Sequence, residues 1–316
     1  MVKQDSASMN LVVFGTSLLW GQGLEDQDKI HTVLARLIEA RNPGCKANVT
    51  FLAHSGASTG FNPDNSVDTL HKPRIHGEVP TLYPTIVQEM EEFDALNIPP
   101  ETIDLVVLDA GSNDVHVTKI LDPLTSPREI SKSTEIYCHQ HMPLLIERLL
   151  DKFKNARIVI VGYYEFITEE SEEGYIHTML TAFGKVPGGF IADFVLEAFE
   201  GLFKRRLLKN CDVFAGESLA AFKEIAADFN GRVPGKRVLV VDPPIKTENA
   251  AFASDPWLWG INDDLSAVDP VAKERAAACE CAGISRTQPL FCSRASAGHP
   301  NPKGAKAYAE AILALL

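Results

Sequence analysis

Hydrophobic residues follow two alternating patterns along this chain: short β-branched runs, and longer stretches with an apolar residue at every third or fourth position. The short runs predict buried parallel strands at Asn10–Phe14, Val49–Ala53, Asp104–Asp109, Arg157–Gly162 and Arg237–Val241. The longer stretches predict helices at Asp28–Ala40, Glu135–Phe153, Phe194–Phe229 (as one helix or two) and Lys303–Leu315. Because strands and helices alternate, the pattern predicts a three-layer α/β/α fold with a central parallel sheet of about five strands and right-handed crossovers.

Two stretches interrupt this alternation. Residues 165–189 are acidic and then carry Gly and Pro, and residues 245–297 contain Trp257, Trp259 and several aspartates. Each follows the carboxyl end of a predicted strand, where open α/β sheets bind their ligands. We expect both to be insertions that shape a substrate cleft within a single domain spanning residues 1–316; surface insertions without a role are the alternative.

Composition narrows the class of protein. With 30 basic and 42 acidic residues the net charge is −12, and no basic stretch offsets it, which argues against nucleic acid as a partner. No apolar run approaches the roughly 18 residues of a membrane span. The polar start MVKQDSASMN lacks the apolar segment of a signal peptide, so we expect a cytoplasmic protein. The sequence leaves the oligomeric state open.

Three of the six cysteines, Cys279, Cys281 and Cys292, lie close together late in the chain. No fourth residue at matching spacing completes a metal site. The cluster therefore favours buried thiols or one disulfide.

The first predicted strand ends in Gly15-Thr16-Ser17-Leu18. Ser17 should therefore lie at the carboxyl edge of the sheet. By itself this turn is most simply a helix cap, because Ser and Thr commonly cap helices after strands.

Three further blocks add to this edge. Ser55-Gly56-Ala57 follows the second predicted strand, Gly111-Ser112-Asn113-Asp114 follows the third, and His299 precedes the last helix. Acyl transfer requires a nucleophile activated by a base, and donors directed at the oxyanion that forms. A serine, a glycine N–H, a carboxamide and an imidazole supply those groups.

These four blocks resemble those of the SGNH hydrolases, the superfamily of GDSL esterases and lipases, in the same order along the chain. The resemblance implies a flavodoxin-like α/β/α domain. It also implies Ser17 as the nucleophile, His299 as the general base, and an oxyanion hole formed by Ser17, Gly56 and Asn113. No metal and no organic cofactor is implied.

Two positions depart from the superfamily pattern. Thr16 stands where the motif has aspartate, and Ser296 stands three residues before His299, where the superfamily has a second aspartate. The group that orients His299 is thus open: Ser296 itself, a backbone carbonyl, or a carboxylate such as Asp242 or Asp255.

The resemblance implies a serine hydrolase that cleaves carboxylic esters of small molecules or lipids through an acyl-enzyme on Ser17. Two alternatives remain: an acyltransferase that uses the same acyl-enzyme, and a weakly active or non-catalytic ligand-binding protein, because Thr16 and Ser296 replace both aspartates.

Overall fold

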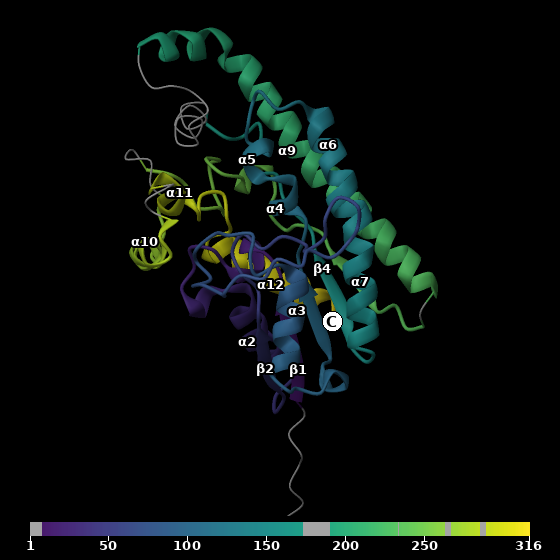
Figure 1. Cartoon of the computed structure of the whole chain (residues 1–316). Helices are drawn as coiled ribbons and strands as arrows, with labels where there is room; N and C mark the ends of the chain where they lie inside the picture. The colour runs from purple at the N-terminus through teal and green to yellow at the C-terminus, as the bar shows by residue number, and fades with distance from the viewer. Residues whose placement is uncertain (1–7, 173–189, 233, 263–266, 285–288) are drawn as a thin grey trace, which may run out of the picture.

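Five parallel strands form the centre of the computed structural model, which describes residues 8–172, 190–232, 234–262, 267–284 and 289–316 (Figure 1). The strands are β1 (Ser8–Phe14), β2 (Lys46–Phe51), β3 (Leu105–Leu108), β4 (Arg157–Val161) and β5 (Val238–Val241). Their order is β2-β1-β3-β4-β5, and every neighbouring pair is parallel. The predicted fold class is confirmed.

Helices occupy the segments between the strands and the part of the chain after β5. They are α1 (Ser17–Trp20), α2 (Ile30–Arg41), α3 (Ile86–Ala95), α4 (Ser112–Val115), α5 (Val117–Ile120), α6 (Pro127–Thr134), α7 (His141–Lys152), α9 (Phe190–Arg232), α10 (Ala272–Cys281), α11 (Pro289–Arg294) and α12 (Pro302–Leu315). Three 3-10 turns, η1 (Asp26–Asp28), η2 (Pro100–Thr102) and η4 (Thr247–Asn249), and one π-helical turn, η3 (Glu135–Gln140), complete the described elements.

The long predicted helices occur with changed boundaries. The stretch predicted at Glu135–Phe153 divides into η3 and α7, and the stretch at Phe194–Phe229 lies within the single helix α9. The prediction omitted α3 and α6. Each begins with a capping box, Thr85 with Gln88 and Ser126 with Glu129, which satisfies backbone N–H groups of the first turn.

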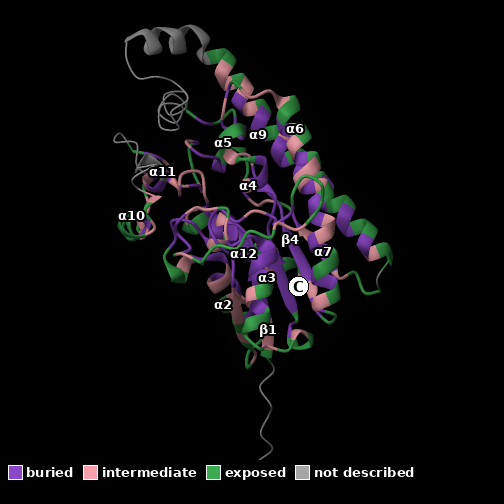
Figure 2. Cartoon of the chain, viewed as in Figure 1, coloured by how far each residue is buried: buried purple, intermediate pink, exposed green. Residues whose placement is uncertain are grey.

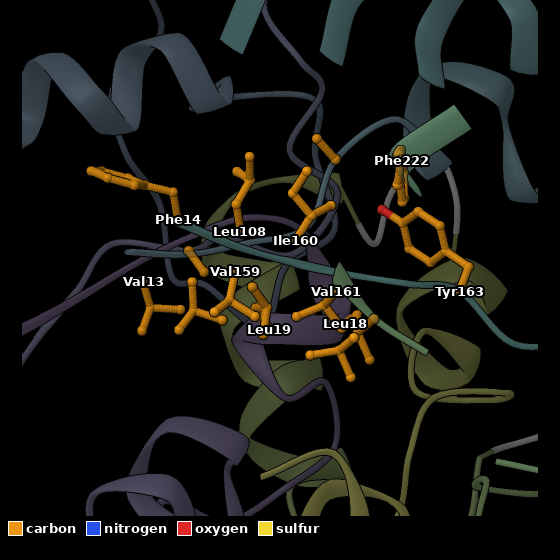
Figure 3. Close-up of a cluster of buried hydrophobic side chains, with 14 of the residues drawn as sticks. Val13, Phe14, Leu18, Leu19, Leu108, Val159, Ile160, Val161, Tyr163 and Phe222 are labelled. Atoms are coloured by element: carbon orange, nitrogen blue, oxygen red, sulfur yellow. The ribbon is translucent and has the colours of Figure 1, made fainter. Parts of the chain in front are cut away.

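The core lies on both faces of the sheet. Figure 3 shows Val13 and Val159 directed to one side and Phe14 and Ile160 to the other, the alternation expected of strands buried on two faces. Helices α3 and α7 cover one face, and α2 and α12 pack together behind it (Figure 1). In Figure 2 the central strands are accordingly buried, whereas exposed residues gather on the outer helix surfaces.

The strand order determines where a ligand can approach. β2 lies on one side of β1 and β3 on the other, so the connections after β1 and β3 leave in opposite directions and open a crevice at the carboxyl ends of those strands. Phe14 pairs with Leu108 at these ends. The Ser17 and Asn113 blocks therefore begin side by side.

The two predicted insertions are described in part. Residues 173–189 of the first, and residues 263–266 and 285–288 of the second, lie outside the described residues. The second contains η4, α10 and α11, and antiparallel bridges join Leu258 to Pro300 and Ile261 to Ala267. Their role in shaping a cleft, and the single-domain organisation, stay predictions.

Candidate active site

Ser17 is the first residue of α1, in the turn that directly follows β1. Gly15 has φ +151°, and a Cβ atom there would lie 2.1 Å from the Asp109 carboxyl oxygen Oδ1, so only glycine fits. Thr16 caps α1, its hydroxyl accepting a hydrogen bond from the Leu18 N–H at 3.5 Å. Thr16 is thus the residue that caps the helix. Its neighbour Ser17, the predicted nucleophile, has a half-buried side chain.

Two buried carboxyl groups accept hydrogen bonds from the backbone of this turn. Asp109, directly after β3, accepts hydrogen bonds from the Thr16 N–H at 2.8 Å, from the Thr16 hydroxyl, and from the Tyr163 hydroxyl at 3.1 Å. Glu89 of α3 accepts the Gly15 N–H at 2.8 Å. Loss of hydration raises the pKa of Asp109 to about 6 and that of Glu89 well above its usual value. A carboxyl group therefore supports the nucleophile turn although the motif itself has threonine.

His299 contacts Ser17 directly. Its Nε2 lies 2.7 Å from the Ser17 Oγ, and its Nδ1 lies 3.3 Å from the backbone oxygen of Ser296. Because a carbonyl oxygen only accepts, Nδ1 carries the proton and Nε2 is left to accept the Ser17 hydroxyl proton. Burial, reinforced by the positive charge of Arg275, lowers the pKa of His299 to about 4, so the ring is neutral at pH 7.

Of the predicted oxyanion-hole residues, Gly56 lies in the loop after β2, whereas Ser17 and Asn113 lie in the short helices α1 and α4. Gly56 has φ +84°, and a Cβ atom there would lie 2.4 Å from the Thr81 backbone nitrogen. The Asn113 side-chain nitrogen donates to the Ala57 carbonyl at 2.9 Å, which leaves its second amide hydrogen for a ligand. Within the described part of the chain, no protein acceptor receives the N–H of Ser17 or of Gly56. Among the described residues, the N–H groups of Ser17 and Gly56 and one amide hydrogen of Asn113 thus remain available as donors.

Ser296 contacts His299 through its backbone, and its side chain contacts a different residue. The buried Ser296 hydroxyl donates to Asp269 Oδ2 at 2.5 Å. Asp269 forms an ion pair with Arg275 at 2.6 Å, and Arg275 forms a second one with Glu78 at 3.2 Å. None of these three charged residues is among the candidates that the sequence suggests, because no local spacing connects them to His299.

The two carboxylates considered as partners of His299 form ion pairs elsewhere. Asp242 lies 2.6 Å from Lys223 and Asp255 lies 2.7 Å from Lys303, and all four side chains are more than half exposed. Of the groups left open by the sequence, it is the Ser296 backbone carbonyl that contacts the imidazole.

Two further polar residues at this edge are structural. Both ring nitrogens of His54 contact backbone oxygens, at 2.8 Å from Ser55 and 3.2 Å from Ile75, and burial lowers the His54 pKa to about 4. Asp114 accepts the Thr59 N–H and hydroxyl and so fixes the neighbouring loop.

Of the late cysteines, Cys279 and Cys292 form a disulfide, and Cys281 is free and exposed. The disulfide alternative left open by the sequence is the one observed. In the described ranges, no cluster of His, Cys, Asp and Glu has a geometry that could hold a metal ion. None of the described helices is both long enough and apolar enough to cross a bilayer.

Comparison with known proteins rests on structure. No family model and no curated protein matches the sequence. Among solved structures, the extracellular lipase of Streptomyces rimosus superposes with a TM-score of 0.53 at 15% identity, covering 98% of this chain and 100% of the lipase. Phospholipase A1 of Streptomyces albidoflavus gives a TM-score of 0.53 at 14% identity, with 98% and 99% covered. The chain therefore shares the three-layer α/β/α fold of these two lipolytic enzymes.

Proposed function

We propose that this protein hydrolyses carboxylic esters through an acyl-enzyme on Ser17. The observation that carries the proposal is the 2.7 Å contact between Ser17 Oγ and His299 Nε2, at the carboxyl edge of the sheet and beside unused N–H donors. A serine is a weak nucleophile until a base accepts its proton, and this geometry supplies the base.

In the first half-reaction, Ser17 Oγ bonds to the ester carbonyl carbon while its proton moves to His299 Nε2. The resulting imidazolium is held by the Ser296 carbonyl through Nδ1–H. Negative charge on the former carbonyl oxygen is stabilised by the N–H groups of Ser17 and Gly56 and the amide of Asn113. Collapse breaks the carbon–oxygen bond, and the alcohol leaves with the proton from His299.

In the second half-reaction, water attacks the acyl carbon as His299 accepts one of its protons. The carbon–Oγ bond then breaks, Ser17 recovers the proton, and the free acid leaves. An alcohol or amine in place of water would give a transfer product, so the acyltransferase alternative shares every step up to the acyl-enzyme.

The substrates we propose are esters of lipids or other small molecules. The two structural neighbours with TM-scores of 0.53 reported above are a lipase and a phospholipase A1. Because the fold is shared at only about 15% identity, these names suggest a substrate class to test first, namely p-nitrophenyl esters of increasing acyl length and a phospholipid.

Covalent labelling tests the proposal. We expect a fluorophosphonate probe to bond through phosphorus to Ser17 Oγ with loss of fluoride, seen by mass spectrometry of the labelled peptide. Ser17→Ala and His299→Ala should each lower kcat by about 10³-fold or more, whereas the exposed control Ser66→Ala should retain activity. Absence of both labelling and ester hydrolysis would support the ligand-binding alternative, and a transfer product in place of free acid would support the acyltransferase.

The compartment is a separate question. The sequence predicts a cytoplasmic protein, whereas a disulfide such as Cys279–Cys292 is typical of oxidising compartments. Counting free thiols in unreduced protein from its natural source decides between them: four would fit the disulfide, and six a reducing compartment.

A further inference from the structure

A chain of buried polar groups continues from His299 away from Ser17. Ser296 lies fully buried beside the histidine, and its hydroxyl donates to Asp269 Oδ2 at 2.5 Å. The Asp269 side chain is 0% exposed, so this carboxylate has no water to solvate it. Its charge is compensated by Arg275, also 0% exposed, whose Nη2 lies 2.6 Å from the same oxygen.

Arg275 connects this chain to the nucleophile side of the site. Its Nη1 lies 3.2 Å from Glu78, which accepts hydrogen bonds from the side chains of Gln22 and Trp20, both at 2.8 Å. Gln22 in turn donates its backbone N–H to the Ser17 carbonyl at 3.1 Å. One continuous set of interactions thus joins the segment after Ser17 to the segment that carries His299.

We propose that Asp269 is a positioning residue for His299 and acts through Ser296. Fixing the Ser296 hydroxyl fixes that residue's orientation, and with it the direction of the carbonyl that accepts Nδ1–H. The Asp269 charge also favours the imidazolium that forms during the reaction. The inference rests on the proposed function, because the base role of His299 is what this arrangement serves.

One feature distinguishes this role from that of a purely structural ion pair. Asp269 is connected to the imidazole through Ser296, whose hydroxyl contacts Asp269 and whose carbonyl contacts His299. Removing the Asp269 charge or the Ser296 hydroxyl should therefore break the same path. The other charged groups along this path are Arg275, which disfavours the imidazolium, and Glu78, which lies beyond Arg275. Asp269→Asn keeps an oxygen and removes the charge, and Ser296→Ala removes the hydroxyl while leaving the carbonyl and the ion pair in place.

The test measures kcat, KM and thermal melting of Asp269→Asn, Ser296→Ala and the double variant on one short-chain ester. We expect each single variant to lower kcat by about 10- to 100-fold with little change in KM, because a base displaced by an ångström loses that much. We expect the double variant to equal the slower single variant, because both act on one path. The control is Asp255→Asn, an exposed aspartate paired with Lys303, which should match wild type.

Several outcomes overturn the inference. An unchanged kcat in Ser296→Ala does so, as does a double variant whose loss equals the product of the two single losses. If Asp269→Asn fails to fold because Arg275 keeps only Glu78 as a carboxylate partner, Ser296→Ala alone decides.

A second readout is independent of turnover. The ¹⁵N chemical shifts of the His299 ring at neutral pH report which nitrogen carries the proton. We expect Nδ1–H in wild type and a mixture of tautomers in Ser296→Ala; the same single tautomer in both would overturn the inference. A wild-type protein inert toward esters and fluorophosphonate, with this tautomer change present, would refute the proposed function and leave the positioning role standing.

Discussion

Thr16 and Ser296 each donate a hydroxyl hydrogen bond to a buried aspartate that is distant in sequence. Thr16 contacts Asp109, 93 residues later, and Ser296 contacts Asp269, 27 residues earlier. In both cases the hydroxyl residue stands where the SGNH pattern has an acid. The carboxyl groups are thus present at the site, one residue further from the reacting atoms, which supports an active enzyme over a non-catalytic relative.

The pKa of His299 gives a prediction for pH dependence. A general base works only when neutral, and burial lowers the His299 pKa from its ordinary 6.5 to about 4. We expect kcat/KM to be level at neutral pH and to fall only as the pH drops through about 4, measured with a stopped assay on a short-chain ester. Melting at each pH serves as the control for unfolding, and an activity loss centred near 6.5 in folded protein would contradict the assignment.

At the scale of elements, α10 and α11 are bonded to each other. Neither helix belongs to the three-layer core, and the Cys279–Cys292 disulfide joins them. Arg275 of α10 also donates to the Cys292 carbonyl at 2.7 Å. The segment just before Ser296 is therefore joined to α10 by one disulfide and by a buried hydrogen bond.

We predict that loss of this disulfide loosens the segment that carries the histidine. The cysteines are 13 residues apart, and closing a loop of that size stabilises the folded state by about 3 kcal/mol. Cys279→Ser/Cys292→Ser should therefore melt at a lower temperature than wild type and show reduced kcat. Cys281→Ser, a free and exposed cysteine on the same helix, is the matched control. Equal melting temperatures for the double variant and wild type would contradict the prediction.

At the scale of the whole molecule, the hydrophobic core packs on the faces of the sheet, and the candidate site lies beyond the carboxyl ends of two strands. The candidate site lies after the carboxyl ends of β1 and β3, whereas Phe153 is buried just before β4 begins. Its ring lies 6.0 Å from that of Phe14 and 5.0 Å from that of Phe93, between the sheet and α3. This aromatic cluster packs against one face of the sheet, and through Phe14, the last residue of β1, it extends to the strand end that leads to Ser17.

Accordingly, Phe153→Ala should lower the free energy of unfolding by about 3–5 kcal/mol, because it removes a fully buried ring and leaves a cavity. Below its melting temperature the variant should retain the wild-type kcat. Denaturant unfolding and steady-state kinetics on the same sample measure both. Leu124→Ala, at a side chain that is 75% exposed, should change stability by no more than about 0.5 kcal/mol. A Phe153→Ala protein that is stable but inactive would show that core and site are coupled.

The parts of the fold that could be predicted are those with local signals. The β-branched runs predicted all five strands to within a few residues, and apolar periodicity predicted α2, α7, α9 and α12. The prediction omitted α3 and α6, although Ile86, Met90 and Phe93 of α3 lie at helical spacing and both helices begin with a capping box. Helices α10 and α11 lie in an insertion, and α10 has no clear apolar periodicity.

In the candidate site, too, the residues with a local sequence signal could be predicted and the others could not. Ser17, Gly56, Asn113 and His299 follow strands or precede a helix, so the alternation of elements was enough to place them at one edge of the sheet. Asp109, Glu89 and Asp269 contact the site through side chains from other segments, and no spacing along the chain reveals such contacts.

The sequence by itself determined the layered architecture and the residue types gathered at one edge, because burial of strands and the direction of parallel strands follow from local pattern. Only the tertiary structure decided which groups support them: that Asp109 lies beneath Thr16, that the Ser296 carbonyl contacts His299, and that Asp242 and Asp255 pair with surface lysines instead. Those contacts depend on how segments far apart in the chain pack against one another. That packing decides both whether a carboxylate is buried and which residue is its nearest partner.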